Sequence, residues 1–144
     1  MEEKLQNEIR ELIGEFDYRE LEEGLNTIYL IDAGKNEYVL KVHTNKSEGY
    51  SEGYRDDQKA RFRSEARIYE LVADETGVPS PEVVHTDFSE EKVPHQFYLM
   101  EKVEGENLDA RKDDLKTSEL EQLLRQYGQM LGEIHSSIEL DSYG

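Results

Sequence analysis

The chain has 144 residues, a length that fits one domain, or one domain and a fragment of another. Its 34 acidic and 17 basic side chains give a net charge of −17, which disfavours binding to nucleic acid or to a membrane surface because both are polyanions. The absence of cysteine excludes disulfides and thiolate metal sites, no apolar run is long enough to span a membrane, and a cytoplasmic protein is expected.

A helix is predicted at the start of the chain. Residues 3–16 place five apolar side chains on one helical face: Leu5, Ile9, Leu12, Ile13 and Phe16. Three short strands are expected next, over residues 18–23, 25–33 and 37–43, because the last two of these runs are rich in β-branched and aromatic residues. The intervening sequence GKN is a hairpin signal, so these strands form an antiparallel meander.

The next segment is polar and then becomes periodic. Residues 44–58 carry two copies of SEGY and predict a surface loop. Residues 59–75 predict a helix that ends before Gly77. Its inward-facing side chains would be Phe62, Ala66, Tyr69, Leu71 and Val72.

A second hairpin and a second long helix complete the predicted elements. Residues 82–88 and 96–103 resemble strands joined by the polar loop SEEKVPH. Residues 107–116 are polar, and a helix follows from Ser118. Its wide apolar stripe, within residues 120–135, predicts a missing partner.

Lys41 is the first candidate site residue. In the strand YVLKVH, alternation puts Lys41 on one face with Val39 and His43, opposite Tyr38, Leu40 and Val42. A lysine on a half-buried strand needs an anionic partner, and Glu65 on the following helix can provide it. Kinase-type enzymes use such a pair to hold the α- and β-phosphates of ATP. The alternatives are a structural ion pair without a ligand and an exposed lysine.

Two further segments are candidate nucleotide contacts. Gly24 lies in the first strand turn, where backbone N–H groups can approach phosphates, and Asn26 and Thr27 can add donors. An ordinary turn is the alternative, and the two preceding glutamates disfavour a phosphate. The run YLMEKVEG ends a strand at Gly105, where backbone groups can pair with adenine; an edge strand with a loop is the alternative.

No catalytic or metal-binding residue is identified. The four histidines lack metal-ligand spacing, and His135 is expected to be a packed core residue on the apolar face of the last helix. Carboxylates are too frequent for one acid–base pair to be singled out, and no P-loop or nucleophile-elbow motif occurs.

Five stretches in order resemble the N-terminal lobe of the aminoglycoside phosphotransferase and choline kinase-like family. They are EEGLNTIYLID, YVLKVH, RFRSEARIYELVADETGVPSPEVV, FYLMEKVEGENL and YGQMLGEIHSS. The resemblance implies an α+β, protein kinase-like fold with a five-stranded antiparallel sheet and a packed helix, and ATP as phosphate donor.

The same resemblance implies a role for each candidate residue. Lys41 would hold the α- and β-phosphates, and Glu65 would orient Lys41. The segment from Gly24 through Asn26 to Thr27 would cover the nucleotide. Met100 would border the adenine pocket, while the Glu101 carbonyl and the Val103 amide would pair with the base.

The family's catalytic half is not matched. Its His-x-Asp-x-x-x-x-Asn loop and its later aspartate, which binds Mg²⁺, have no counterpart here. We therefore expect residues 1–103 to be a nucleotide-binding lobe and residues 104–144 to be a hinge and the first helical part of a truncated second lobe. The full-length protein would phosphorylate a small-molecule hydroxyl, aminoglycoside-like or other, and this chain alone would be inactive.

Two other interpretations remain open. The chain could be a non-catalytic remnant or interaction module that forms a homodimer through the apolar helix at 118–137. Its acidity, which we interpret as the solvated surface of a halophilic protein, could instead serve a cationic ligand or mimic nucleic acid.

Overall fold

The computed structural model describes residues 1–23, 26–44 and 52–139. They belong to two compact units. The first comprises residues 1–69 and 81–102, and the second comprises residues 70–80 and 103–144.

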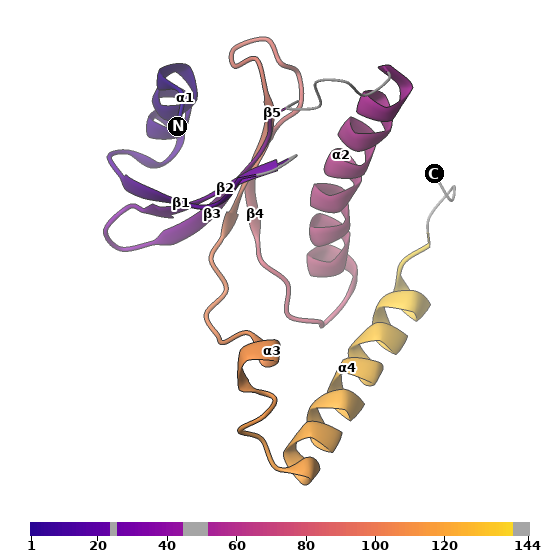
Figure 1. Cartoon of the computed structure of the whole chain (residues 1–144). Helices are drawn as coiled ribbons and strands as arrows, with labels where there is room; N and C mark the ends of the chain where they lie inside the picture. Colours follow the sequence, from indigo (N-terminus) through magenta and orange to yellow (C-terminus); the bar gives the residue numbers. More distant parts are fainter. Residues whose placement is uncertain (24–25, 45–51, 140–144) are drawn as a thin grey trace. The chain divides into compact units, whose positions relative to one another are not determined.

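The first unit contains one five-stranded antiparallel sheet with the strand order β1-β2-β3-β5-β4 (Figure 1). Its elements are α1 (Glu3–Ile13), β1 (Asp17–Glu23), β2 (Asn26–Asp32), β3 (Glu37–His43), β4 (Val83–Asp87), β5 (Gln96–Glu101) and α2 (Glu52–Glu75) up to residue 69; the end of α2 belongs to the second unit. This arrangement confirms the predicted α+β fold and the predicted meander over β1, β2 and β3. The strand β3 is central, so both of its edges are hydrogen-bonded.

The helices α1 and α2 cover opposite faces of the sheet (Figure 1). On the α1 face, Leu5 and Ile9 pack into a cluster of buried side chains. The strands and the loop before β5 contribute the remainder of that cluster: Tyr29, Ile31, Tyr38, Leu40, Val42, Val93, Phe97 and Leu99. On the α2 face, a smaller cluster of Phe62, Ala66 and Tyr98 is bordered by Tyr69, Phe88 and Met100. The larger core therefore lies on the side away from α2.

The turn between β2 and β3 matches the predicted hairpin. Gly34 has a φ of 80°, a left-handed conformation that favours glycine. The Gly34 amide donates to Oδ1 of Asp32 at 2.8 Å, and the Ala33 amide donates to the Asn36 carbonyl at 3.0 Å. These bonds close the turn and set the register that places Ile28 opposite Lys41.

The helix α2 begins earlier than predicted. Residues 52–58 were expected to be loop, but they form its first two turns. These turns are mostly exposed, so they lack the apolar periodicity that marks a packed helix. The ion pair between Asp57 and Arg61, 2.9 Å long and four residues apart, belongs to this solvated part. The rest of the predicted loop, residues 45–51, lies outside the described residues.

The loop between β4 and β5 also differs from the prediction. After Phe88 it is the predicted polar run SEEKVPH, yet Val93 within this run is buried in the α1-face core. Glu90 in the same loop has a φ of 59°, which is uncommon for a residue with a side chain. The loop is therefore held by a buried side chain and has an unusual backbone conformation, and a count of polar residues reveals neither feature.

The second unit contains α3 (Leu108–Arg111) and α4 (Thr117–Ser137). The short α3 was not predicted; Asn107 caps it by accepting a 2.8 Å hydrogen bond from the Asp109 amide. Within this unit, the Gly77 amide donates to Oε1 of Glu133 at 2.7 Å. His135 is exposed, so the prediction of a packed core histidine is wrong.

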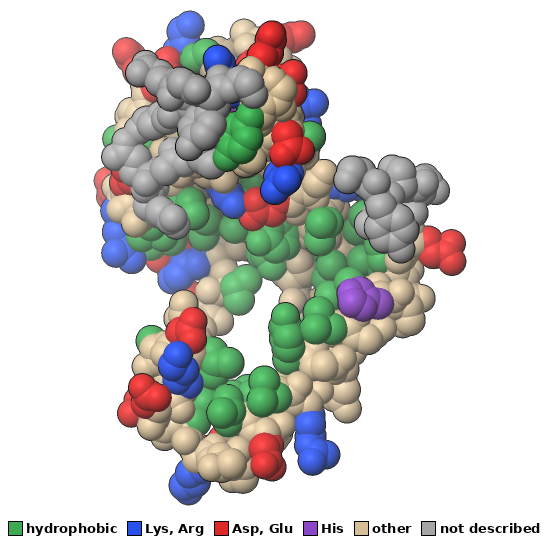
Figure 2. Space-filling model, turned by 45° about the vertical axis from the view of Figure 1, so that its right-hand side comes forward, with side chains coloured by type: hydrophobic (Ala, Val, Ile, Leu, Met, Phe, Trp, Pro, Cys, Tyr) green, Lys and Arg blue, Asp and Glu red, His purple; other side chains and the backbone are tan. Residues whose placement is uncertain are grey.

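The apolar stripe of α4 is largely exposed. Leu123, Leu124, Tyr127, Met130 and Leu131 are between 37% and 61% accessible. Figure 2 shows apolar side chains gathered over α3 and α4 in the lower part of the view. In the part of the chain that the structure describes, none of the helices is both long enough and apolar enough to cross a bilayer.

Candidate functional site

Lys41 and Glu65 form the predicted ion pair. The Lys41 Nζ lies 2.7 Å from both Oε1 and Oε2 of Glu65, so one ammonium binds both oxygens of the carboxylate. The side chains of Lys41 and Glu65 are 15% and 37% accessible. The lysine is thus shielded by the sheet, while the carboxylate stays partly open to water. This charge pair lies at the surface of the sheet and within reach of a ligand.

The strand β3 positions the ammonium by its alternation. Tyr38, Leu40 and Val42 are buried in the α1-face core, as predicted, so Lys41 and His43 face α2. The His43 ring lies 5.5 Å from the Phe62 ring of α2, which confirms this orientation.

Partly exposed apolar side chains lie beside Lys41 on the same face. We name Ile28, Leu30, Val39 and Met100 the apolar patch. Ile28 pairs with Lys41, Leu30 pairs with Val39, and Val39 pairs with Met100. Residues paired across strands share a face, and all four are only half-buried. An apolar surface next to a shielded cation suits a ligand with a flat ring and an anionic tail.

Sequence reasoning identified Met100 but missed the other three members of the apolar patch. Alternation alone was a usable signal for Val39, which is two residues before Lys41. For Ile28 and Leu30 the signal was the register between β2 and β3, which is set by the turn at Gly34.

The predicted glycine-turn residues are separated by the sheet. Asn26 lies on the Lys41 face, where its Oδ1 is 3.1 Å from Nδ1 of His43. Alternation turns Thr27 to the α1 face, where it is 3% exposed and lines a cavity of about 190 Å³ with Tyr29 and His95. The Thr27 side chain is therefore not brought to Lys41. Gly24 lies outside the described residues.

The predicted adenine-edge residues fall in both units. Met100 and Glu101 end β5 in the first unit, and the Glu101 amide donates to the Glu82 carbonyl at 2.9 Å. Val103 belongs to the second unit and is 65% exposed.

A second group of charges ties α2 to the β4–β5 loop. The Lys59 Nζ lies 2.5 Å from Oε1 of Glu90. Gln96, buried on β5, donates to the same Glu90 oxygen at 3.0 Å and accepts from Nε of Arg63 at 3.2 Å. The hydrogen bond from Lys59 is the largest of the effects that lower the pKa of Glu90. Sequence reasoning did not find this group, because its bonded partners are 31 and 33 residues apart and Glu90 lies in a polar loop.

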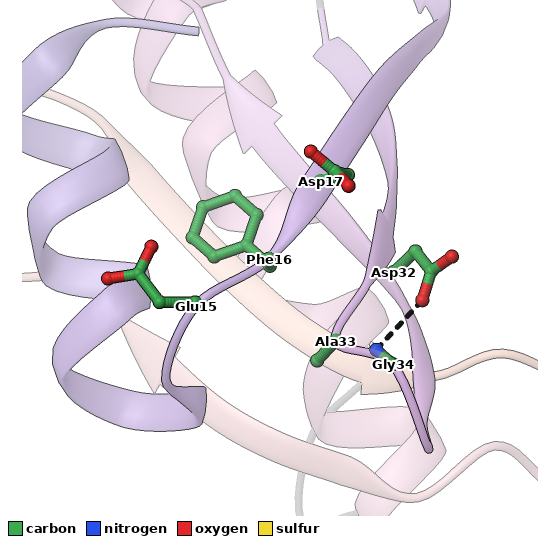
Figure 3. Close-up of a pocket in the computed structure, with 6 residues that line it drawn as sticks. All are labelled: Glu15, Phe16, Asp17, Asp32, Ala33 and Gly34. Atoms are coloured by element: carbon green, nitrogen blue, oxygen red, sulfur yellow. Dashed lines mark hydrogen bonds between the residues drawn. The ribbon is translucent and has the colours of Figure 1, made fainter.

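A wider pocket near the β2–β3 turn is a poor site for an anion (Figure 3). Glu15, Phe16, Asp17, Asp32, Ala33 and Gly34 line its volume of about 410 Å³. Three of these residues are carboxylates and none is basic, so the pocket repels phosphate. Among the described residues, no three or more His, Asp or Glu side chains converge as metal ligands.

Comparison with known proteins decides the family. The model of the phosphotransferase enzyme family matches residues 17–141. The chain belongs to the phosphotransferase enzyme family. Curated proteins, by contrast, yield no significant match.

Solved structures of phosphotransferases share the fold. A thermostable mutant of aminoglycoside phosphotransferase APH(4)-Ia, in ternary complex with AMP-PNP and hygromycin B, has a TM-score of 0.60 at 18% identity, covering 95% of this chain and 40% of that one. Another mutant of the same enzyme, with ADP and hygromycin B, has a TM-score of 0.59 at 19% identity, covering 94% and 40%. The sheet with its packed helix is therefore the kinase-like N-lobe of this phosphotransferase family. The chain spans 28% to 40% of the solved structures that it matches.

Proposed function

We propose that this chain is the ATP-binding lobe of a phosphotransferase that moves the γ-phosphate of ATP to a hydroxyl group of a small molecule. The single observation that carries the proposal is the 2.7 Å pair of Lys41 and Glu65 beside the apolar patch. Family membership supports phosphoryl transfer as the reaction class. The AMP-PNP and ADP bound to the related structures support ATP as the donor.

In this proposal each part of the face meets one part of the nucleotide. The Lys41 ammonium contacts the α- and β-phosphates, and Glu65 keeps that ammonium directed at them. The apolar patch packs against the adenine ring, with Met100 at its border. Backbone groups of Glu101 and Val103 pair with the adenine edge.

The glycine turn has a smaller role in the proposal. Gly24 and the backbone of Asn26 and Thr27 cover the phosphates, while the Thr27 hydroxyl, which is buried on the α1 face, takes no part. Asn26 contributes its side chain, because its amide lies on the Lys41 face.

Transfer itself is assigned to residues outside this chain. Mg²⁺ accompanies ATP in phosphoryl transfer, but the described residues offer no convergent carboxylates for it. We propose residues 1–103 as the nucleotide-binding lobe and residues 104–144 as hinge and first helix of the catalytic lobe. The acceptor, aminoglycoside-like or other, would bind beyond them. On this account the 144 residues bind nucleotide in the cytoplasm and do not catalyse transfer alone.

Mapping by NMR tests the proposal. Titration of the ¹⁵N- and methyl-labelled chain with AMP-PNP should shift the signals of Ile28, Val39 and Met100 more than those of Ile31 and Leu40, which lie on the α1 face. Adenosine, which lacks phosphates, is the matched control. It should shift the NMR signals of the apolar patch and leave the signal of the Lys41 amide unchanged. Shifts confined to the α1 face would overturn the proposal.

Self-association through α4 is a second candidate function. The observation in its favour is the exposed apolar face, which with Leu108 of α3 borders a hollow of about 400 Å³. A second copy could cover this face, because large exposed apolar patches mark interaction sites.

A further inference from the structure

Tyr98 is a buried tyrosine whose ring is well packed but whose hydroxyl lacks a hydrogen bond. Its side chain is completely inaccessible to solvent, and its ring lies 5.1 Å from the Phe62 ring and 6.5 Å from the Tyr69 ring. The hydroxyl finds no hydrogen-bond partner among the residues that the structure describes. Buried hydroxyls are nearly always bonded, because an unpaired one has lost its water without compensation.

The sheet places this hydroxyl next to the phosphate-binding pair. Tyr98 on β5 is the register partner of Lys41 on β3, so both side chains emerge on the α2 face. Burial raises the pKa of the Tyr98 hydroxyl, and the charge of Glu65 and a weak interaction with its carboxylate raise it further, although this contact does not have the geometry of a hydrogen bond. The hydroxyl therefore stays protonated and remains a donor, and Glu65 is a charged acceptor in its surroundings.

Lys41 occupies that carboxylate in the present arrangement. One ammonium contacts both oxygens at 2.7 Å, so each oxygen already accepts a charged hydrogen bond. A nucleotide phosphate, as the proposed function requires, would draw Nζ away from at least one of these oxygens. The oxygen released in this way would need a new donor, since a carboxylate that is 37% exposed beside a sheet is only partly hydrated.

We propose that Tyr98 is a positioning residue that forms a hydrogen bond with Glu65 when the Lys41 ammonium turns to the phosphates. Its hydroxyl then donates to the released carboxylate oxygen, so that Glu65 stays directed at Lys41 with one oxygen. Binding of the nucleotide thereby satisfies a hydroxyl that is unpaired in the free chain. The inference rests on the proposed function, because it assigns the pull on Lys41 to a phosphate.

A stability cycle tests the exchange without any nucleotide. Lys41→Met removes the ammonium and imitates its departure. In the wild-type background, Tyr98→Phe removes an unpaired hydroxyl and should leave the unfolding temperature unchanged or raise it. In the Lys41→Met background it should lower the unfolding temperature by roughly 2–4 °C, because the hydroxyl now binds Glu65. The same effect in both backgrounds would overturn the proposal.

Tyr38→Phe is the matched control. Tyr38 is also a buried tyrosine, but it lies on the α1 face and accepts a 3.1 Å hydrogen bond from Asn36. Its substitution should change the unfolding temperature equally in both backgrounds, because it does not touch Glu65.

Nucleotide binding provides the second readout, which also decides the case where Lys41→Met fails to fold. Tyr98→Phe should weaken AMP-PNP binding about five- to tenfold, and Glu65→Gln should abolish that difference between tyrosine and phenylalanine. Equal affinities of wild type and Tyr98→Phe would overturn the proposal. Failure of the wild type to bind AMP-PNP would instead count against the proposed function, and the stability cycle would then decide the role of Tyr98.

Discussion

Lys41 and Glu65 come from a central strand and a packed helix, 24 residues apart, and one ammonium contacts both carboxylate oxygens at 2.7 Å. Both partners are held by the cores beneath them. Leu40 and Val42 fix β3 from the α1 side, while Phe62 and Ala66 fix α2 against Tyr98. The pair is therefore a consequence of the packing of both sheet faces.

Glu90 makes stability depend on pH. Lys59, by its hydrogen bond, lowers the pKa of the Glu90 carboxyl in the folded chain. The unfolded chain then binds more protons, so this contribution is complete above the ordinary carboxyl pKa and is lost as the pH falls through the folded value. Glu90→Gln should therefore flatten the decline in stability between about pH 6 and pH 3. Urea unfolding across that range measures it.

The matched control for Glu90 is its exposed neighbour. Glu91→Gln alters the same net charge without touching Lys59, and it should keep the wild-type pH profile. Identical profiles for Glu90→Gln and Glu91→Gln would show that the Lys59 contact contributes nothing.

Gly34 should be sensitive to substitution for a reason of backbone conformation. Its φ of 80° is strained for any side chain, although no atom lies within 4 Å of the added Cβ. Gly34→Ala should cost about 1–2 kcal/mol of stability in denaturant unfolding. Gly53→Ala, also in open space but helical, should be neutral or stabilising by up to about 1 kcal/mol. A smaller loss at Gly34 than at Gly53 would contradict the assigned turn.

The sequence predicts the sheet because its apolar signals are local. The alternation around Leu40 and the turn at Gly34 each depend on a few neighbouring residues, and both predictions are confirmed. The pair of Lys41 and Glu65 was also predictable, since a half-buried ammonium requires a counter-charge from the next element.

The features that the sequence does not predict depend on contacts between residues that are distant in sequence. Val93 is buried because it packs on the α1-face core. Glu90 has a left-handed backbone conformation that no sequence motif predicts. The first turns of α2 are solvated, so no apolar period marks them. Asn26 and Thr27 were both assigned to the phosphates as turn residues, but both belong to β2, where neighbouring side chains face opposite sides of the sheet.

Salt should stabilise the chain. With a net charge of −17, the acidic side chains repel one another over distances of about a Debye length. This length falls from about 30 Å at 0.01 M salt to about 8 Å at 0.15 M. The unfolding temperature should rise by at least about 2 °C over this range, with NaCl and KCl equivalent. A constant or falling temperature would contradict the interpretation of the acidic surface as adapted to salt.

The exposed face of α4 predicts concentration-dependent association. Leu124 and Tyr127 are 57% and 61% exposed, so a second copy would bury them. Sedimentation velocity should show dimers that Leu124→Glu with Tyr127→Glu abolishes. Glu121→Gln, on the same helix, should leave them intact. A strict monomer at every concentration would eliminate self-association.

Calorimetric titration with ATP tests the central claim most directly. Lys41→Met removes the ammonium that we assign to the α- and β-phosphates and should weaken binding at least about tenfold, the change expected for about 1.4 kcal/mol. Lys35→Met is the matched control, because Lys35 is exposed in the β2–β3 turn and its loss changes the net charge equally. The account predicts that Lys35→Met binds ATP like the wild type while Lys41→Met does not. Equal affinities of the two variants would contradict it.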